Sequence, residues 1–282
     1  MRRDAAISAV RRLCKGDAGF KTDTGSLMAA IGKPDADGLI ESLLECGVIP
    51  ESFGHDSSEE KLYAKYCDVL LSFAFNRMGI KSEVIEERAD SADVAGRTNN
   101  YTLVGDAKAF RLSRTAKNQK DFKVTALSEW RGIKDYACLV CPIYQYPAKR
   151  RSQIYRQALQ SNVTLLGYVH LTFLIEHSRG RKTDLSPVWR VGKTTAPTDA
   201  AAAYWSAVDK SVCEAVGKTS EDLHKFKERE RAVLEKIKKV EIRYLEDRIE
   251  QIKALSRREA IALLIEEMNL PSRISQIRRI NY

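Results

Sequence analysis

An acid and a lysine separated by one residue, in Asp106-Ala107-Lys108, are the side chains of this sequence best suited to chemistry. They end an apolar run that starts at Tyr101 and predicts a β-strand. Because strand side chains alternate, Asp106 and Lys108 are expected on one face, about 7 Å apart. A carboxylate can hold a divalent cation, and an ammonium group can orient or deprotonate a water and offset charge on a phosphate. The pair therefore indicates phosphodiester hydrolysis as the candidate chemistry.

The elements around this pair have the order of a mixed α/β domain. Ser57-Ser-Glu-Glu60 is a capping box, and the apolar stripe behind it predicts a helix that ends at Gly79. Further predicted elements are strands over 82–87, from Asp93, over 101–110, over 136–141 and over 163–169, and helices over 125–133, 149–158, 171–177, 220–255 and 256–268. Strands that alternate with helices favour a central sheet flanked by helices.

A long block of residues around the pair runs from Asp106 to Lys108, from Arg111 to Lys123 and through Ala126-Leu-Ser-Glu-Trp-Arg131 and Lys134-Asp-Tyr-Ala137. This block resembles a known enzyme family, the HindIII-type restriction endonucleases. Weaker similarity extends the match to about residues 57–171, and both ends of the chain match poorly. The resemblance implies the fold class: an α/β core of the PD-(D/E)xK type with helical N- and C-terminal regions.

The resemblance also implies an activity and partners. Enzymes of this type are homodimers that depend on magnesium, with manganese as the expected substitute, and that cut double-stranded DNA at the palindrome AAGCTT. Cleavage of this kind leaves 5′-phosphates. A cognate methyltransferase is expected to act on the same DNA site and not as a bound subunit.

The expected active site contains four catalytic residues, Asp93, Asp106, Lys108 and Asp121. Magnesium prefers hard oxygen ligands, so two acids must converge on one cation. We expect Asp93, Asp106 and the Ala107 carbonyl at the first metal, and Asp121 at a second. Glu60 and Glu86 are alternative acids.

The loop after the strand is the expected DNA-reading segment. Paired hydrogen bonds from Asn118 or Gln119 suit adenine, and a cation suits guanine or phosphate. The predicted DNA-binding residues are Arg114, Lys117, Asn118, Gln119, Lys120 and Lys123, with Asn118 and Lys120 as base readers. The alternative is that all these cations bind phosphate and carry no sequence information.

Composition agrees with a polyanionic partner but does not name it. The formal net charge is +9 and the pI about 9.2, which a merely basic cytoplasmic protein would share. Six scattered cysteines favour reduced, buried thiols, and Cys138-Leu-Val-Cys141 reads as a buried strand because no second pair completes a zinc site. Without a signal-like apolar start or a membrane-length run, we expect a cytoplasmic protein.

Four regions are expected along the chain: an N-terminal helical region (1–56), a nuclease core (57–180), a loop-rich connection (181–219) and a C-terminal helical arm (220–282). The arm either forms a dimer, embraces DNA or is a solvated surface. The predicted function is a type II restriction endonuclease. Its rivals are a DNA-binding relative without catalysis and a structure-specific repair nuclease on the same core.

Overall fold

The computed structural model describes residues 2–15, 24–85, 91–114, 119–147, 152–179 and 183–279. The chain divides into two compact units, Met1–Ile237 and Lys238–Tyr282. The first unit contains the sheet and the predicted site, and the second consists of helices.

A five-stranded mixed sheet forms the centre of the first unit. Its strands are β1 (Lys81–Val84), β2 (Val94–Arg97), β3 (Thr102–Ala107), β4 (Tyr136–Val140) and β5 (Val163–Leu166), in the spatial order β1-β2-β3-β4-β5. The first three strands pair antiparallel, whereas β3, β4 and β5 pair parallel. The structure thus confirms the expected α/β fold class.

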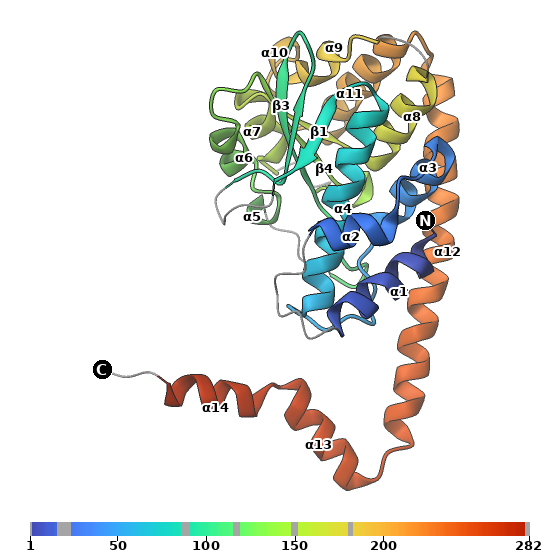
Figure 1. Ribbon diagram of the computed structural model, residues 1–282, viewed down its shortest axis with the longest axis vertical. Coiled ribbons are helices and arrows are strands. Elements are labelled where there is room, and N and C mark those ends of the chain that lie inside the picture. The colour runs from blue at the N-terminus through green and yellow to red at the C-terminus, as the bar shows by residue number, and fades with distance from the viewer. Residues whose placement is uncertain are drawn as a thin grey trace. The chain divides into compact units, whose positions relative to one another are not determined.

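Helices cover both sides of this sheet. Figure 1 shows α6 (Val124–Arg131) and α7 (Ile154–Gln160) on one side, and α4 (Ser58–Arg77) and α8 (Tyr168–Ser178) on the other. The remaining helices of this unit are α1 (Arg3–Cys14), α2 (Thr24–Ile31), α3 (Ala36–Cys46), the short α5 (Gln119–Phe122), α9 (Ser186–Trp189), α10 (Val191–Thr194), α11 (Ala201–Val216) and the first part of α12 (Ser220–Lys253). A 3-10 turn, η1 (Ile143–Gln145), follows β4.

Helix α4 begins where the capping box predicts it. The Ser57 side chain accepts a hydrogen bond from the Glu60 amide at 3.1 Å, which satisfies one of the free N–H groups of the first turn. The inner face of α4 approaches β3 closely at Gly105. A Cβ atom there would lie 3.0 Å from Leu71 and 3.3 Å from Phe75, so glycine lets the helix lie directly on the strand.

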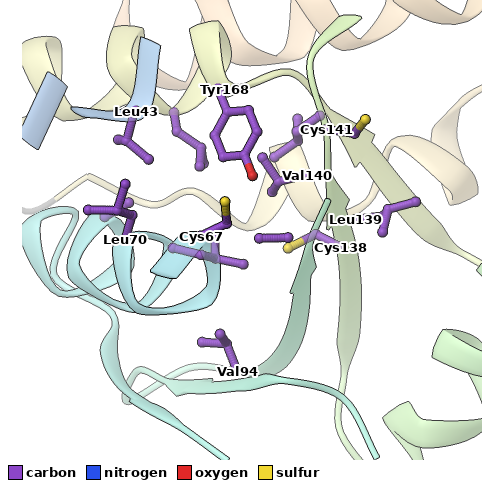
Figure 2. Close-up of a cluster of buried hydrophobic side chains, with 14 of the residues drawn as sticks. Leu43, Cys67, Leu70, Val94, Cys138, Leu139, Val140, Cys141 and Tyr168 are labelled. Carbon is purple, nitrogen blue, oxygen red and sulfur yellow. The ribbon is translucent and has the colours of Figure 1, made fainter. Parts of the chain in front are cut away.

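The core between α4, α8 and the sheet is apolar and contains buried thiols. Figure 2 shows Cys67 of α4 and Cys138 of β4 in one cluster with Tyr168 of α8. Cys138 and Cys141 are fully buried, and all six cysteines are free. The prediction that Cys138-Leu-Val-Cys141 belongs to a buried strand segment is confirmed.

Residues 181–219 differ from the loop-rich connection that we expected. In the described part of this range, α9 and α10 lie on either side of Arg190, and α11 adds sixteen helical residues. Val188 and Trp189 are fully buried, and Trp189 donates a hydrogen bond to the Tyr101 hydroxyl at 3.1 Å. Pro187 lies in the first turn of α9 and Gly192 lies within α10, so neither residue keeps this segment out of a helix.

The second unit contains the end of α12, α13 (Arg257–Glu267) and α14 (Leu270–Arg278). Ser256 caps α13 through a capping box with Glu259, and Pro271 lies in the first turn of α14. Among the described residues of this unit, twelve large apolar side chains are exposed. No helix in the described ranges is long and apolar enough to cross a membrane.

Candidate active site

The site lies where β3 extends beyond its neighbour β2. The last paired residues of these strands are Gly105 and Val94, so Asp106 and Ala107 have no partner on β2. Asp93 directly precedes Val94 and therefore comes to the same end of the ladder. On the other side the pairing with β4 continues, and the Lys108 amide donates to the Val140 carbonyl at 2.7 Å. Strand β3, still paired with β4, thus carries Asp106 beyond the end of β2.

Two predicted acids meet here. The carboxylates of Asp93 and Asp106 lie, together with that of Asp68 from α4, within 4.8 Å of one another. The Lys108 ammonium contacts Asp106 Oδ1 at 2.7 Å, so both side chains are on one face, as the alternation of strand residues predicts. The arrangement is three carboxylates with an ammonium group at their edge.

The backbone around Lys108 is held from both sides. The Tyr168 hydroxyl donates to the Lys108 carbonyl at 3.1 Å, and the amide of Phe110 donates to the Gly47 carbonyl at 3.2 Å. Val48 forms an isolated parallel bridge with Phe110. The segment that leaves β3 is therefore ordered by contacts from residues far away in the sequence.

Burial and mutual repulsion shift the ionisation of the acids. Burial, opposed by Lys108 and assisted by Asp93, raises the pKa of Asp106 from 3.8 to about 6. Burial and then the neighbouring Asp93 and Asp106 carboxylates raise the pKa of Asp68 well above its usual value. Burial alone would lower the pKa of Lys108, but the carboxylates raise it. Without a bound cation, Lys108 is therefore an ammonium group. An ammonium group can stabilise negative charge on a phosphate but cannot accept a proton from water.

Sequence reasoning missed Asp68 and its neighbour Lys65. Both lie on α4, and the Lys65 ammonium is 3.6 Å from Asp93 and 3.9 Å from Asp68. A signal existed: Asp68 is a charged residue inside the otherwise apolar stretch from Tyr66 to Leu71, and it is buried with it.

Asp121 lies outside the acid group in the described structure. Its carboxylate pairs with the Arg114 guanidinium at 2.6 Å, and that guanidinium also lies 5.0 Å from the centre of the Phe110 ring. The Lys123 ammonium lies 5.5 Å from the Trp130 ring centre, and its residue has left-handed backbone angles at the start of α6. Gln119 and Lys120 belong to α5, whereas Lys117 and Asn118 lie outside the described residues.

The alternative acids do not join the group either. Glu60 forms an ion pair with Arg111 at 3.2 Å and accepts a hydrogen bond from the Asp56 amide. It belongs to a separate set with His55 and Asp56, of which the latter two are exposed. Glu86 lies outside the described residues.

Comparison with known proteins gives the family. The family model of the HindIII restriction endonucleases matches residues 3–281. The chain is 37% identical over 266 residues to the type II restriction enzyme HindIII of Haemophilus influenzae, which covers 92% of this chain and 88% of that protein. This chain belongs to the HindIII restriction endonuclease family. The similarity includes both ends of the chain, which we expected to match poorly.

The acid group has a donor set that suits a divalent cation. Three hard oxygen donors from different elements converge within 4.8 Å. Asp106 is fully buried, and its Oδ2 atom has no hydrogen-bond partner among the described residues. A buried carboxylate oxygen is costly to leave unpaired, so this atom fits a metal ligand.

Proposed function

We propose that this protein is a type II restriction endonuclease that makes Mg²⁺-dependent double-strand cuts at AAGCTT in cytoplasmic DNA. The observation that carries the proposal is the convergence of Asp93 and Asp106 beside the Lys108 ammonium where β3 extends beyond β2. The family assignment supports the same reaction class. Mn²⁺ is the expected substitute for Mg²⁺, because both accept carboxylate oxygens.

Asp93 and Asp106 would hold the cation, with the Ala107 carbonyl as a further oxygen donor. When bound, the cation would supply Lewis-acid stabilisation of the charge on the phosphate. Lys108 donates a hydrogen bond from its ammonium to a non-bridging phosphate oxygen or to the attacking water, and its rigid backbone fixes the direction of that bond. The water attacks phosphorus in line and releases its proton to solvent, while the P–O3′ bond breaks and the 3′ oxygen takes up a proton from solvent. One product therefore carries a 3′-hydroxyl and the other a 5′-phosphate.

Asp121 has a separate proposed role. It would serve a second cation site or position Arg114, with which it pairs at 2.6 Å. Arg114 is partly exposed and lies over the Phe110 ring, a position from which its guanidinium would reach DNA. We assign base reading to Asn118 and Lys120, and phosphate or base contacts to Arg114, Lys117, Gln119 and Lys123.

A homodimer follows from the proposed palindromic target, because two identical subunits related by a two-fold axis read its two halves. The second unit offers an apolar surface for this contact. Twelve of the fourteen large exposed apolar side chains found among the described residues belong to it, including Leu264 at 59% exposure. Monomeric proteins seldom leave so much apolar surface in water. We assign this surface to contact with a second copy of the chain.

Plasmid digestion tests the activity. Purified protein with plasmid and Mg²⁺ should give discrete fragments that end at AAGCTT. Lys108→Ala should abolish cutting but retain DNA binding when Ca²⁺ replaces Mg²⁺, and Lys81→Ala on exposed β1 is the matched control that should cut normally. Nicks at mismatches or junctions would indicate a repair nuclease. Retarded but intact plasmid would indicate a binding protein, and full activity of Lys108→Ala would remove Lys108 from the mechanism.

Sedimentation velocity tests the dimer. The wild-type protein should sediment as a dimer, and Leu264→Glu should shift it toward monomer because burying a carboxylate in an apolar contact is costly. Ile133→Glu is the matched control, because Ile133 is fully exposed in the first unit. A monomeric wild-type protein, or equal dimerisation of both variants, would contradict the assignment.

A further inference from the structure

Helix α4 places two charged side chains against the acid pair although it carries no part of the Asp-x-Lys motif. Lys65 and Asp68 are three residues apart and therefore lie on one side of the helix. The Lys65 ammonium is 3.6 Å from Asp93 and 3.9 Å from Asp68, and it donates to the Ile85 carbonyl at 3.3 Å. One helix turn thus faces both the β2 end and the β3 end of the site.

A structural role accounts for only part of Asp68. Its Oδ1 atom accepts a hydrogen bond from the Ala107 amide at 3.4 Å, which serves the N–H group that β2 leaves unpaired. A neutral acceptor such as asparagine would do the same. The residue is instead a carboxylate that is 5% exposed and lies within 4.8 Å of two others. Burying a third like charge opposes folding unless a cation compensates it.

The charges of the group leave room for such a cation. When all three carboxylates are ionised, they and the Lys65 and Lys108 ammonium groups leave one net negative charge. The buried Oδ2 atom of Asp106 has no hydrogen-bond partner in the described structure. A partnerless buried oxygen and an uncompensated charge at the same place both indicate a missing positive ligand.

We infer that Asp68 is a third carboxylate ligand of the divalent cation site, and that Lys65 is its counter-ion when the cation is absent. The inference rests on the proposed function for the identity of the cation but concerns residues outside the family's Asp-x-Lys motif. Lys65 then competes with the cation for Asp68 and Asp93. Removing Asp68 should weaken cation binding, and removing the Lys65 charge should strengthen it.

Mn²⁺ binding without DNA measures both effects, with the free ion followed by electron paramagnetic resonance on the full chain. Asp68→Asn keeps an acceptor for the Ala107 amide and should weaken Mn²⁺ binding at least about tenfold, the loss usual when a metal site loses carboxylate support. Lys65→Met should tighten binding at least about fivefold, because Lys65 lies within 4 Å of the carboxylates that would hold the ion. Two unit charges about 4 Å apart already repel by this factor in a water-like dielectric, and Mn²⁺ carries two charges. Asp135→Asn, at an exposed acid that accepts hydrogen bonds from Thr102, should bind as wild type does.

The two variants keep the inference separate from folding and from the proposed function. Thermal unfolding in chelator should show that Asp68→Asn is at least as stable as wild type, because one like charge is removed. Wild-type binding by Asp68→Asn, weaker binding by Lys65→Met, or no Mn²⁺ binding by the wild type would each overturn the inference. If the binding changes occur but plasmid stays uncut, the proposed function fails and the ligand assignment stands.

Discussion

Replacing Asp106 by asparagine should abolish activity and at the same time stabilise the cation-free protein. The structure holds the ionised carboxylate in a buried position beside Asp93 and Asp68, with Lys108 as partial compensation. Asparagine has nearly the same shape but no charge, so it removes repulsion without leaving a cavity. An active-site residue that destabilises the fold is an expected cost of function.

The size of the effect follows from the raised pKa. The pKa of Asp106 moves from 3.8 to about 6, which corresponds to about 3 kcal/mol against the ionised form. The new amide N–H groups need partners, so we expect a net gain of about 1 to 3 kcal/mol in the free energy of unfolding. For a unit of this size the melting temperature should rise by roughly 2 to 10 °C.

The gain should depend on pH with a defined sign. A carboxyl whose folded-state pKa is raised costs nothing below its unfolded value of 3.8, and the cost is fully present above about 6. The difference in stability between Asp106→Asn and wild type should therefore be close to zero near pH 4, grow between pH 4 and 6, and level off above. Added Mg²⁺ should stabilise the wild type and leave the variant unchanged.

Thermal unfolding followed by circular dichroism, in chelator and then in Mg²⁺, measures these differences. Asp135→Asn is the control of opposite sign, because hydrogen bonds from Thr102 lower the pKa of Asp135 and its charge favours the folded state. A melting temperature of Asp106→Asn below that of wild type at pH 8 in chelator would refute the reasoning. So would a difference that shrinks as the pH rises from 4 to 6.

Two further predictions concern the frame of the site. Tyr146→Phe should lower the free energy of unfolding by about 1 to 2 kcal/mol in urea titrations, because the hydroxyl donates to the carbonyls of Leu139 and Leu166 at 3.0 and 3.2 Å; an unchanged midpoint would contradict this. Gly47→Ala should lower the melting temperature, because the new Cβ would lie 2.2 Å from the rigid Pro142 ring, at a cost of about 1 to 3 kcal/mol. It should also lower the cleavage rate, because Gly47 belongs to the segment that anchors the end of β3. A variant that melts and cleaves as wild type does would contradict both expectations.

The sequence by itself determined the local features of this protein. The alternation of side chains along a strand is a property of neighbouring residues, so it predicted Asp106 and Lys108 on one face. In the structure, the Lys108 Nζ atom lies 2.7 Å from Asp106 Oδ1. The capping boxes at Ser57 and Ser256 are equally local, and both open helices at the expected residues. The long block shared with the HindIII-type enzymes also indicated the family, which the whole-chain comparison confirms.

Only the tertiary structure decided which distant side chains share the site. Asp68 is 38 residues before Asp106, and no sequence periodicity relates them. They come together because β3 extends beyond the end of β2 and α4 packs against this unpaired part of β3. Asp121 is nearer in sequence, yet its carboxylate pairs with Arg114. Local pattern fixes the direction of a side chain within its own element, whereas packing between elements fixes which carboxylates repel one another and can share a cation.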